Sequence, residues 1–149
     1  MIKSVLCAVD ISNDDLDSGV LERAAVLADL DGAQLDVVTV LPDYGESFVG
    51  SFFEPGHHEQ AVAKAQEALE ALGKSVLGEE RNAKIRHVVA TGTAYQEILH
   101  TAKEAGSDLI VIGAHRPDLK DYLLGPNAAR VVRHSDVSVY VVRSVTAGA

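Results

Sequence analysis

The segment "VIGAHRPDLKDYLLGPNAARVV", residues 111–132, has the pattern of a strand, a loop and a helix in succession. An apolar run ends at Gly113, eleven mixed residues follow, and Gly125 and Pro126 open a helical pattern. Glycine at each end of the loop lets backbone approach a neighbouring group without a Cβ atom in the way. The segment predicts a strand–loop–helix unit whose loop either holds a phosphate or only connects two elements.

Outward from this segment, short apolar runs alternate with helical patterns along the whole chain. Strands are predicted at 4–10, 34–43, 84–92, 108–113 and 138–144, and helices at 13–31, 58–77, 94–105 and 126–134. This alternation predicts an α/β fold of one domain: an open, parallel, five-stranded sheet with helices on both faces, Rossmann-like in architecture. The domain spans 1–144, and 145–149 are expected to form a frayed C-terminal tail.

Two helix ends carry recognisable signals. Thr93 and Gln96 have the spacing of a capping box, in which each side chain bonds the other residue's backbone N–H. Arg133 and His134 fall in the last turn of the final helix, where positive charge offsets the helix dipole. We interpret these four side chains as structural.

Composition and charge exclude several classes of protein. A chain of 149 residues with 47% hydrophobic and 23% charged residues can bury a sizeable core and is not typical of disorder. No apolar run approaches the roughly 18 residues of a membrane span, and the N-terminal apolar stretch is too short for a signal peptide. A net charge of −9 disfavours nucleic acid as a main partner, and a membrane surface likewise. We therefore expect a cytoplasmic protein with no membrane insertion.

Cys7 is the single cysteine, so the chain cannot form an internal disulfide. It lies in the most apolar part of the first predicted strand, which favours a buried small hydrophobe over a reactive thiol. His57 and His58, with Glu54 and Glu59 nearby, have the composition of a metal cluster. Adjacent histidines rarely point at one ion, so no metal site is predicted.

The position of the first and fourth strands predicts where a ligand would bind. If the first strand is central, the strand order reverses between it and the fourth, whose ends are Asp10 and Gly113. Ligands of open α/β sheets bind at such a reversal. The helix that starts near Pro126 would point the N–H groups of Asn127 and Ala128 at an anion. The phrase "GPN" lacks the Lys-Ser/Thr pair of a Walker A loop, so these residues alone leave phosphate binding open.

Three stretches, "VLCAVDIS", "GSDLIVIGAHR" and "LLGPNAARVVRHSDVSVYVVR", resemble the universal stress protein family in residues and in order. The resemblance covers 2–144 and implies the strand order 3-2-1-4-5. One branch of that family binds ATP through three spaced glycines followed by Ser or Thr. Gly113 and Gly125 match the first and third glycines, whereas Arg116 replaces the second and Pro126 replaces the Ser or Thr. The His-Arg-Pro loop also resembles a nucleotide-binding sub-branch that lacks the middle glycine.

The resemblance implies a set of ATP-binding residues and their roles. Asp10 would approach the ribose, Ala8 and Val9 would wall the adenine pocket, and Val40 would meet the adenine edge through its backbone. The arginine at 116 would offer its guanidinium to the phosphates, and the amide of Asn127 would assist. The implied set is Ala8, Val9, Asp10, Val40, Ile112, Gly113, His115, Arg116, Gly125, Pro126, Asn127 and Ala128. From the residues alone, Asp10 has a second interpretation, as a brace for the first helix together with Ser12.

The function expected from these patterns is that of an ATP-binding universal stress protein, a stress-response regulator whose nucleotide occupancy changes what an unidentified protein partner meets. The cofactor is ATP, with or without Mg²⁺, and the chain is expected to form a homodimer through 138–144. Two alternatives remain open: a dimeric interaction module that binds no nucleotide, and a slow ATP hydrolase. No catalytic residue is assigned, because the sequence contains no arrangement typical of a nucleophile or acid–base pair. The loop 43–57, which carries all three phenylalanines, is expected to tuck onto the domain.

Overall fold

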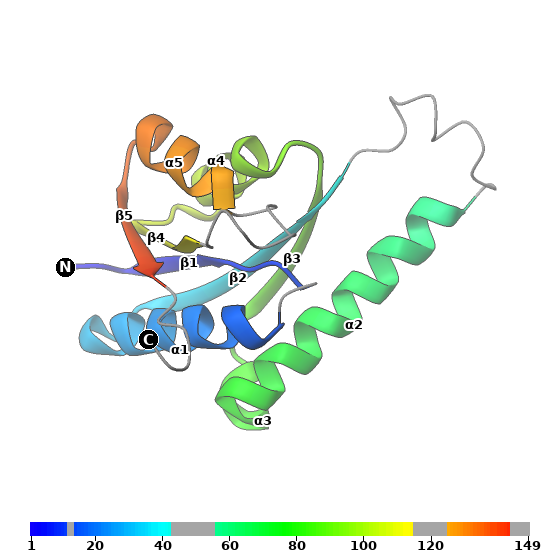
Figure 1. Cartoon of the computed structure of the whole chain (residues 1–149). Coiled ribbons are helices and arrows are strands. Elements are labelled where there is room, and N and C mark those ends of the chain that lie inside the picture. Colours follow the sequence, from blue (N-terminus) through cyan, green and yellow to red (C-terminus); the bar gives the residue numbers. More distant parts are fainter. Residues whose placement is uncertain (12–13, 43–55, 115–124, 144–149) are drawn as a thin grey trace, which may run out of the picture.

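The computed structural model describes residues 1–11, 14–42, 56–114 and 125–143. Five parallel strands form one sheet in the order β3-β2-β1-β4-β5, with helices on both faces (Figure 1). The elements are β1 (Ser4–Ala8), α1 (Asp14–Asp31), β2 (Gln34–Leu41), α2 (His57–Leu77), α3 (Glu79–Asn82), β3 (Arg86–Thr91), α4 (Ala94–Ala105), β4 (Leu109–Ala114), α5 (Gly125–His134) and β5 (Ser138–Arg143). The predicted fold class and strand order are confirmed.

The apolar runs become the central strands because those strands are covered on both faces. Every residue of β1 is buried, and β4 is buried from Leu109 to Gly113. The edge strands β3 and β5 are only half-buried, which agrees with their more mixed sequences. Parallel strands in α/β proteins read as continuous hydrophobic runs for this reason.

The helices divide the core into two layers. Helices α1 and α2 pack on one face of the sheet through residues such as Leu21 and Leu69. Helices α4 and α5 pack on the opposite face through residues such as Ile98 and Val131 (Figure 1). All four named side chains are fully buried. Successive strand residues alternate between the two layers. The chain continues from β1 to α1 on one face of the sheet and from β4 to α5 on the opposite face.

The capping box predicted at the start of α4 is wrong. Thr93 does precede the helix with extended backbone, but its hydroxyl makes no capping hydrogen bond. The side chain of Gln96 donates to the hydroxyl of Tyr95 instead of reaching back to the backbone. The stop signal of the same helix is confirmed, because Gly106 adopts left-handed backbone with a φ of 67°.

Helix α3, which the sequence pattern did not predict, closes a polar corner against α2 and β3. His87 Nε2 lies 2.7 Å from Asn82 Oδ1, and His87 Nδ1 lies 3.3 Å from a carboxylate oxygen of Glu70. The amide nitrogen of Asn82 donates to the backbone carbonyl of Glu70. Gly73 of α2 is buried directly against Asn82. This corner ties the short helix to the sheet through side chains that are mostly buried.

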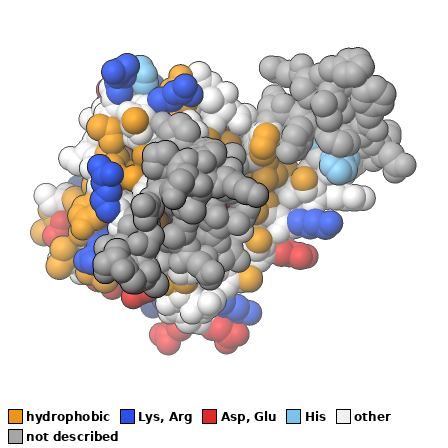
Figure 2. All heavy atoms as spheres, viewed as in Figure 1, with side chains coloured by type: hydrophobic (Ala, Val, Ile, Leu, Met, Phe, Trp, Pro, Cys, Tyr) orange, Lys and Arg blue, Asp and Glu red, His pale blue; other side chains and the backbone are white. Residues whose placement is uncertain are grey.

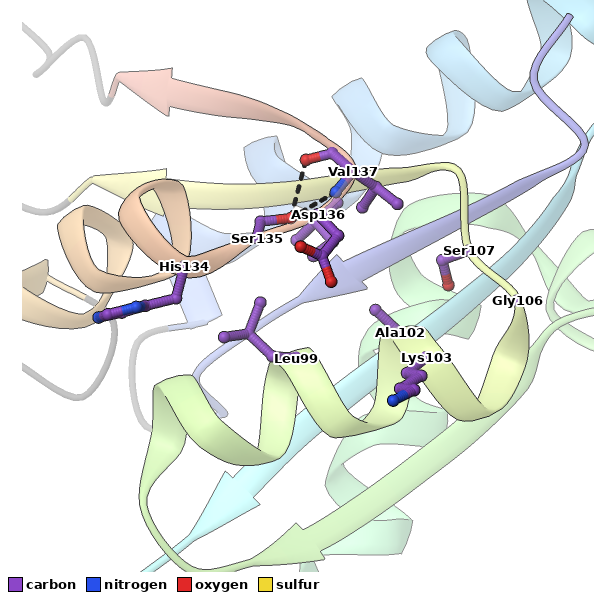
Figure 3. A pocket seen from close by; sticks show the side chains of 10 residues that line it. Leu99, Ala102, Lys103, Gly106, Ser107, His134, Ser135, Asp136 and Val137 are labelled. Atoms are coloured by element: carbon purple, nitrogen blue, oxygen red, sulfur yellow. Dashed lines mark hydrogen bonds between the residues drawn. The ribbon is translucent and has the colours of Figure 1, made fainter.

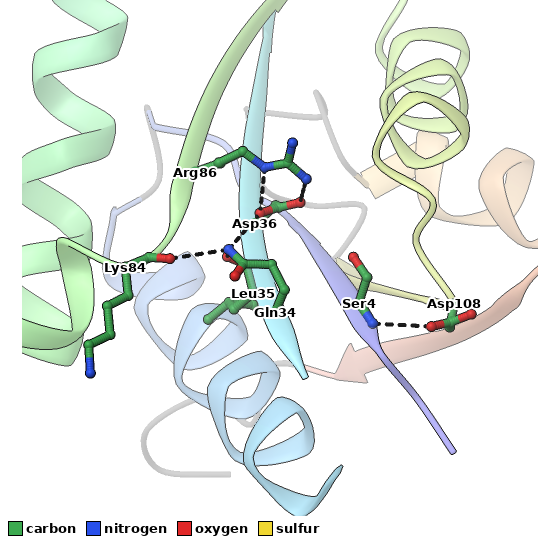
Figure 4. A network of polar contacts seen from close by, with 7 residues as sticks. All are labelled: Ser4, Gln34, Leu35, Asp36, Lys84, Arg86 and Asp108. Atoms are coloured by element: carbon green, nitrogen blue, oxygen red, sulfur yellow. Dashed lines mark hydrogen bonds and ion pairs between the residues drawn. The ribbon is translucent and has the colours of Figure 1, made fainter. Parts of the chain in front are cut away.

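A second polar network holds the amino-terminal ends of the strands (Figure 4). Asp36 of β2 is 1% exposed and receives two hydrogen bonds from the Arg86 guanidinium, at 3.1 and 2.7 Å, and one from the side chain of Gln34. The paired carboxylate raises the pKa of Arg86. Asp108, just before β4, accepts the backbone N–H groups of Lys3 and Ser4 at 2.7 and 3.1 Å. These N–H groups lower the pKa of Asp108.

Candidate functional site

The carboxyl ends of β1 and β4 lie side by side at the point where the strand order reverses. Ala8 is paired with Ile112 in the parallel register, and Gly113 is paired with Val142 of β5. From this edge the chain leaves β1 toward α1 on one face and β4 toward α5 on the other (Figure 1). Elements that diverge to opposite faces leave the strand ends between them uncovered by either helix.

The residues expected to wall an adenine base are part of the core. Ala8, Val40 and Ile112 pack in the layer beneath α4 and α5, and Val9 packs in the layer beneath α1 and α2. None of the four side chains is more than 3% exposed. The backbone of Val9 is also engaged, because its N–H donates to the carbonyl of Val38 at 2.9 Å. These residues can therefore form the floor of a site but expose little side-chain surface to a ligand.

Asp10 and Asp17 form a buried pair of carboxylates at the start of α1. The backbone N–H of Asp10 donates to Asp17 Oδ2, and the two residues are 1% and 0% exposed. Ser12, the partner expected from the sequence, lies outside the described residues. The brace that the structure shows comes from Asp17, which the sequence pattern did not single out. Its position one turn into a predicted helix, after two other aspartates, gave no sign of burial.

Cys7 lies one residue before the end of β1 and is fully buried. Burial raises the pKa of its thiol well above the ordinary value, and the nearby Asp17 carboxylate raises it further. A thiol with a raised pKa carries little thiolate and is a poor nucleophile. The interpretation of Cys7 as a buried hydrophobe is confirmed.

The first turn of α5 is joined to α4 by one long-range hydrogen bond. Asn127 Oδ1 accepts the backbone N–H of Tyr95 at 3.2 Å. Tyr95 is the second residue of α4, whose early N–H groups have no partner within the helix. The Asn127 side chain is thus directed at α4, and Ala128 beside it is buried at 4% exposure. The side-chain oxygen of Asn127 serves as a cap for the neighbouring helix.

Further along α5, the side chains of Arg130 and His134 contact the Tyr95 ring of α4. The Tyr95 ring stacks on His134, with 5.7 Å between ring centroids, and the guanidinium of Arg130 lies 5.6 Å from the centre of the Tyr95 ring. Arg133 and His134 occupy the last turn of α5, as the sequence pattern predicted. The position of Arg130 over an aromatic face was not anticipated, because its partner lies on another helix.

Several of the predicted site residues fall outside what the structure describes. His115 and Arg116 lie in the segment 115–124, and for Gly125 and Pro126 only their place at the start of α5 is described. Of the suggested metal ligands, His58 shares a hydrogen bond of 3.2 Å with the hydroxyl of Thr91, and Glu54 is outside the described ranges. Within those ranges no group of three or more His, Cys, Asp or Glu side chains is placed to hold a metal ion.

Comparison with known proteins places this architecture among related chains. A family model described as "Universal stress protein family" matches residues 1–143. Universal stress protein G of Escherichia coli O157:H7 is 29% identical over 145 residues, covering 96% of this chain and 100% of the relative. No described helix is long and apolar enough to span a membrane.

Solved structures share the fold at lower sequence identity. The structure of MJ0577 from Methanocaldococcus jannaschii gives a TM-score of 0.75 at 22% identity, covering 97% of this chain and 98% of that one. A universal stress protein in complex with cAMP gives 0.62 at 22% identity, with the same coverage. The Archaeoglobus fulgidus protein in complex with dAMP gives 0.62 at 21% identity, covering 93% and 96% of the two chains. At these identities the likeness is one of fold.

Proposed function

The chain belongs to the universal stress protein family, and on that premise we propose that it binds an adenine nucleotide, with ATP as the main ligand, where β1 and β4 end. Nucleotide occupancy would change the surface that a protein partner meets. The protein would then act as a stress-response regulator through its bound state rather than through turnover.

The observation that carries this proposal is the reversal of strand order between β1 and β4, with α5 as the next described element after β4. Gly113 is buried at the end of β4, and Gly125 is the first residue of the helix. A helix start attracts phosphate through its free N–H groups and its dipole. The first turn of α5 contains no acidic residue to repel an anion. Related proteins crystallised with cAMP and with dAMP support adenine as the base.

The buried walls suggest how the base and ribose would be held. Because Ala8, Val40 and Ile112 expose little side chain, recognition of adenine would come from backbone groups at the strand ends. Asp10 would meet the ribose through its carboxylate, which is not the group bonded to Asp17, because the Asp17 brace holds the backbone N–H of Asp10. Arg116 would face the phosphates in place of the glycine that the ATP-binding branch has there, with Mg²⁺ as an accompanying cation.

The test is a titration of the purified protein with ATP, dAMP, cAMP and adenosine, after bound nucleotide has been removed and identified by mass spectrometry. We expect saturable binding of ATP below millimolar concentration. Gly125→Val should abolish it, since a branched side chain would occupy the phosphate position, and circular dichroism must show that the variant is folded. Binding that is absent in the wild type, or unchanged in folded Gly125→Val, would contradict the proposal.

Arg116→Ala separates the phosphate contact from the base contact. Loss of a charge-assisted hydrogen bond should weaken ATP by about tenfold to a hundredfold while adenosine changes little. Arg133→Ala, at the other end of α5, is the matched control and should leave both affinities unchanged. Equal losses for both ligands would remove Arg116 from the phosphate site. Phosphate release measured with and without Mg²⁺ tests the slow hydrolase alternative in the same samples.

A dimeric interaction module is the second candidate, and the edge position of β5 favours it. Within the described residues β5 pairs with β4 alone, and Tyr140 on this strand is 40% exposed (Figure 1). Figure 2 shows hydrophobic side chains beside Lys and Arg side chains on the side of the molecule where β5 runs. Such an edge invites pairing with a second copy of the chain. A lysine introduced on an edge strand discourages this pairing. A dimer in sedimentation that becomes monomeric in Tyr140→Lys would support this interface, and a wild-type monomer would exclude it.

A further inference from the structure

A second pocket, of about 280 Å³, lies at the end of the sheet opposite the proposed nucleotide site (Figure 3). It is bounded by the ends of α4 and α5, by the turns that follow them and by Ile110 of β4. Its volume is slightly below the range of about 300–1,000 Å³ typical of sites for drug-sized ligands. The size therefore favours a smaller molecule.

One wall of the pocket is apolar. It is formed by Leu99 and Ala102 of α4, Ile110 of β4 and Val137 just before β5. Ile110 and Ala102 are buried, at 0% and 5% exposure, so this wall is a fixed part of the core. A ligand that fits must have an apolar body of a few carbon atoms to cover it.

Ser107 lines the same pocket and is a buried polar residue whose bonding is incomplete. The residue is 6% exposed, and its hydroxyl has no hydrogen-bond partner among the described residues. A buried hydroxyl without a partner is costly, and such groups in native proteins call for an explanation. Its neighbour Ser135 differs, because that hydroxyl donates to the carbonyl of Val137 and accepts its N–H. The Ser107 oxygen has almost no exposed surface, so the pocket offers a ligand no hydroxyl group from this residue.

The charge at the pocket is negative. Asp136 lines it and makes no ion pair with any described residue, and Figure 3 shows its carboxylate on the pocket side of the turn before β5. Helices α4 and α5 both end here, and the carbonyl end of a helix carries partial negative charge. Two cationic residues also border the pocket, but Figure 3 shows Lys103 directed away from it, and the His134 ring is stacked on Tyr95.

We propose that this pocket binds a small aliphatic primary amine. The ammonium group would meet the Asp136 carboxylate and the negative helix ends. The hydrocarbon chain would cover the wall formed by Leu99, Ala102, Ile110 and Val137. Nothing in this pairing involves the nucleotide site, which lies beyond the opposite ends of the strands.

The test uses 3-methylbutylamine as the probe and nuclear magnetic resonance of the ¹⁵N-labelled, nucleotide-free protein as the readout. We expect saturable shifts in the amide signals of Ser107, Asp136 and Val137 at low millimolar amine, the affinity that suits so small a ligand. The isosteric alcohol 3-methylbutanol should bind about tenfold more weakly, because it lacks the charge-assisted hydrogen bond. No saturable shift, or equal binding of amine and alcohol, would overturn the proposal.

Two variants locate the charge that recognises the amine. Asp136→Asn should remove the preference for amine over alcohol while leaving the apolar wall intact. Glu22→Gln makes the same change of charge on α1, on the other face of the sheet, and should keep the preference. An amine preference that survives in Asp136→Asn, or that disappears equally in Glu22→Gln, would show that the amine responds only to the overall negative charge.

Discussion

The side-chain oxygen of Asn127 accepts the backbone N–H of Tyr95 at 3.2 Å, so the first turn of α5 caps the start of α4. The two residues are separated by 32 positions in the sequence. This bond joins the helix start proposed to receive phosphate to the helix beside it. The ring of Tyr95 then contacts Arg130 and His134 further along α5.

The cap predicts unequal losses of stability for two substitutions. Asn127→Ala should lower the free energy of unfolding by about 1 kcal/mol, as the loss of a helix cap usually does. Thr93→Ala should cost much less, because the Thr93 hydroxyl makes no capping hydrogen bond. Urea unfolding of both variants measures the difference. A larger loss in Thr93→Ala would restore the local capping box and contradict the long-range cap.

Two arginine–aspartate pairs differ in the burial of the carboxylate. Arg86→Ala leaves the Asp36 carboxylate, which is 1% exposed, with only the Gln34 side chain, and should cost about 1–3 kcal/mol of stability. Arg81→Ala breaks a pair of the same length, 2.7 Å, with an Asp29 side chain that is 60% exposed. That loss should be about 0.2–1 kcal/mol. Equal losses in chemical denaturation would show that burial of Asp36 carries no cost.

Gly73 is required by the polar corner between α2 and α3. A Cβ atom there would lie 1.9 Å from Asn82 Oδ1 and 3.3 Å from His87 Nε2, so Gly73→Ala must displace side chains that are bonded to each other. Overpacking of this kind costs about 1–3 kcal/mol, more than alanine gains in a helix. Gly19→Ala in α1 meets nothing within 4 Å and should stabilise the protein by up to about 1 kcal/mol. Thermal unfolding measures the melting temperature of each variant. A melting temperature that rises in both variants, or falls in both, would contradict this account.

Asp108 should make stability depend on pH in the acidic range. The N–H groups of Lys3 and Ser4 hold the pKa of its carboxyl below the ordinary value of about 3.9. Its contribution is therefore present above the ordinary pKa and is lost as the pH falls through the lower pKa of the folded state. Asp108→Ala should be less stable than the wild type at pH 7, and the difference should shrink on acidification. Urea midpoints across that range measure it, and a difference independent of pH would contradict the prediction.

The sheet was predictable because burial on both faces leaves a direct trace in the sequence. A central parallel strand such as β1 has no solvent-facing positions, so its five residues read as one apolar run. The proposed location of the site rests on the same strands, which the sequence pattern ends at Asp10 and Gly113 and the structure ends at Ala8 and Ala114. What sequence patterns did not contain were contacts between distant segments. The cap from Asn127 and the brace from Asp17 each depend on how a helix packs, and α3, at 4 residues, is too short to show a period.

β1 is synthesised first, yet its second neighbour in the sheet is β4, and the bond from Ser4 to Asp108 spans 104 residues. At about 5–20 residues per second, a ribosome needs about 5–20 s to make the intervening chain. Throughout that interval one edge of a strand that is apolar after Ser4 has no partner, which is the condition that favours pairing between nascent chains. We therefore expect the yield of folded protein to be limited by the rate at which β4 reaches β1. Slower translation between residues 10 and 108 should lower that yield without changing the stability of the finished fold.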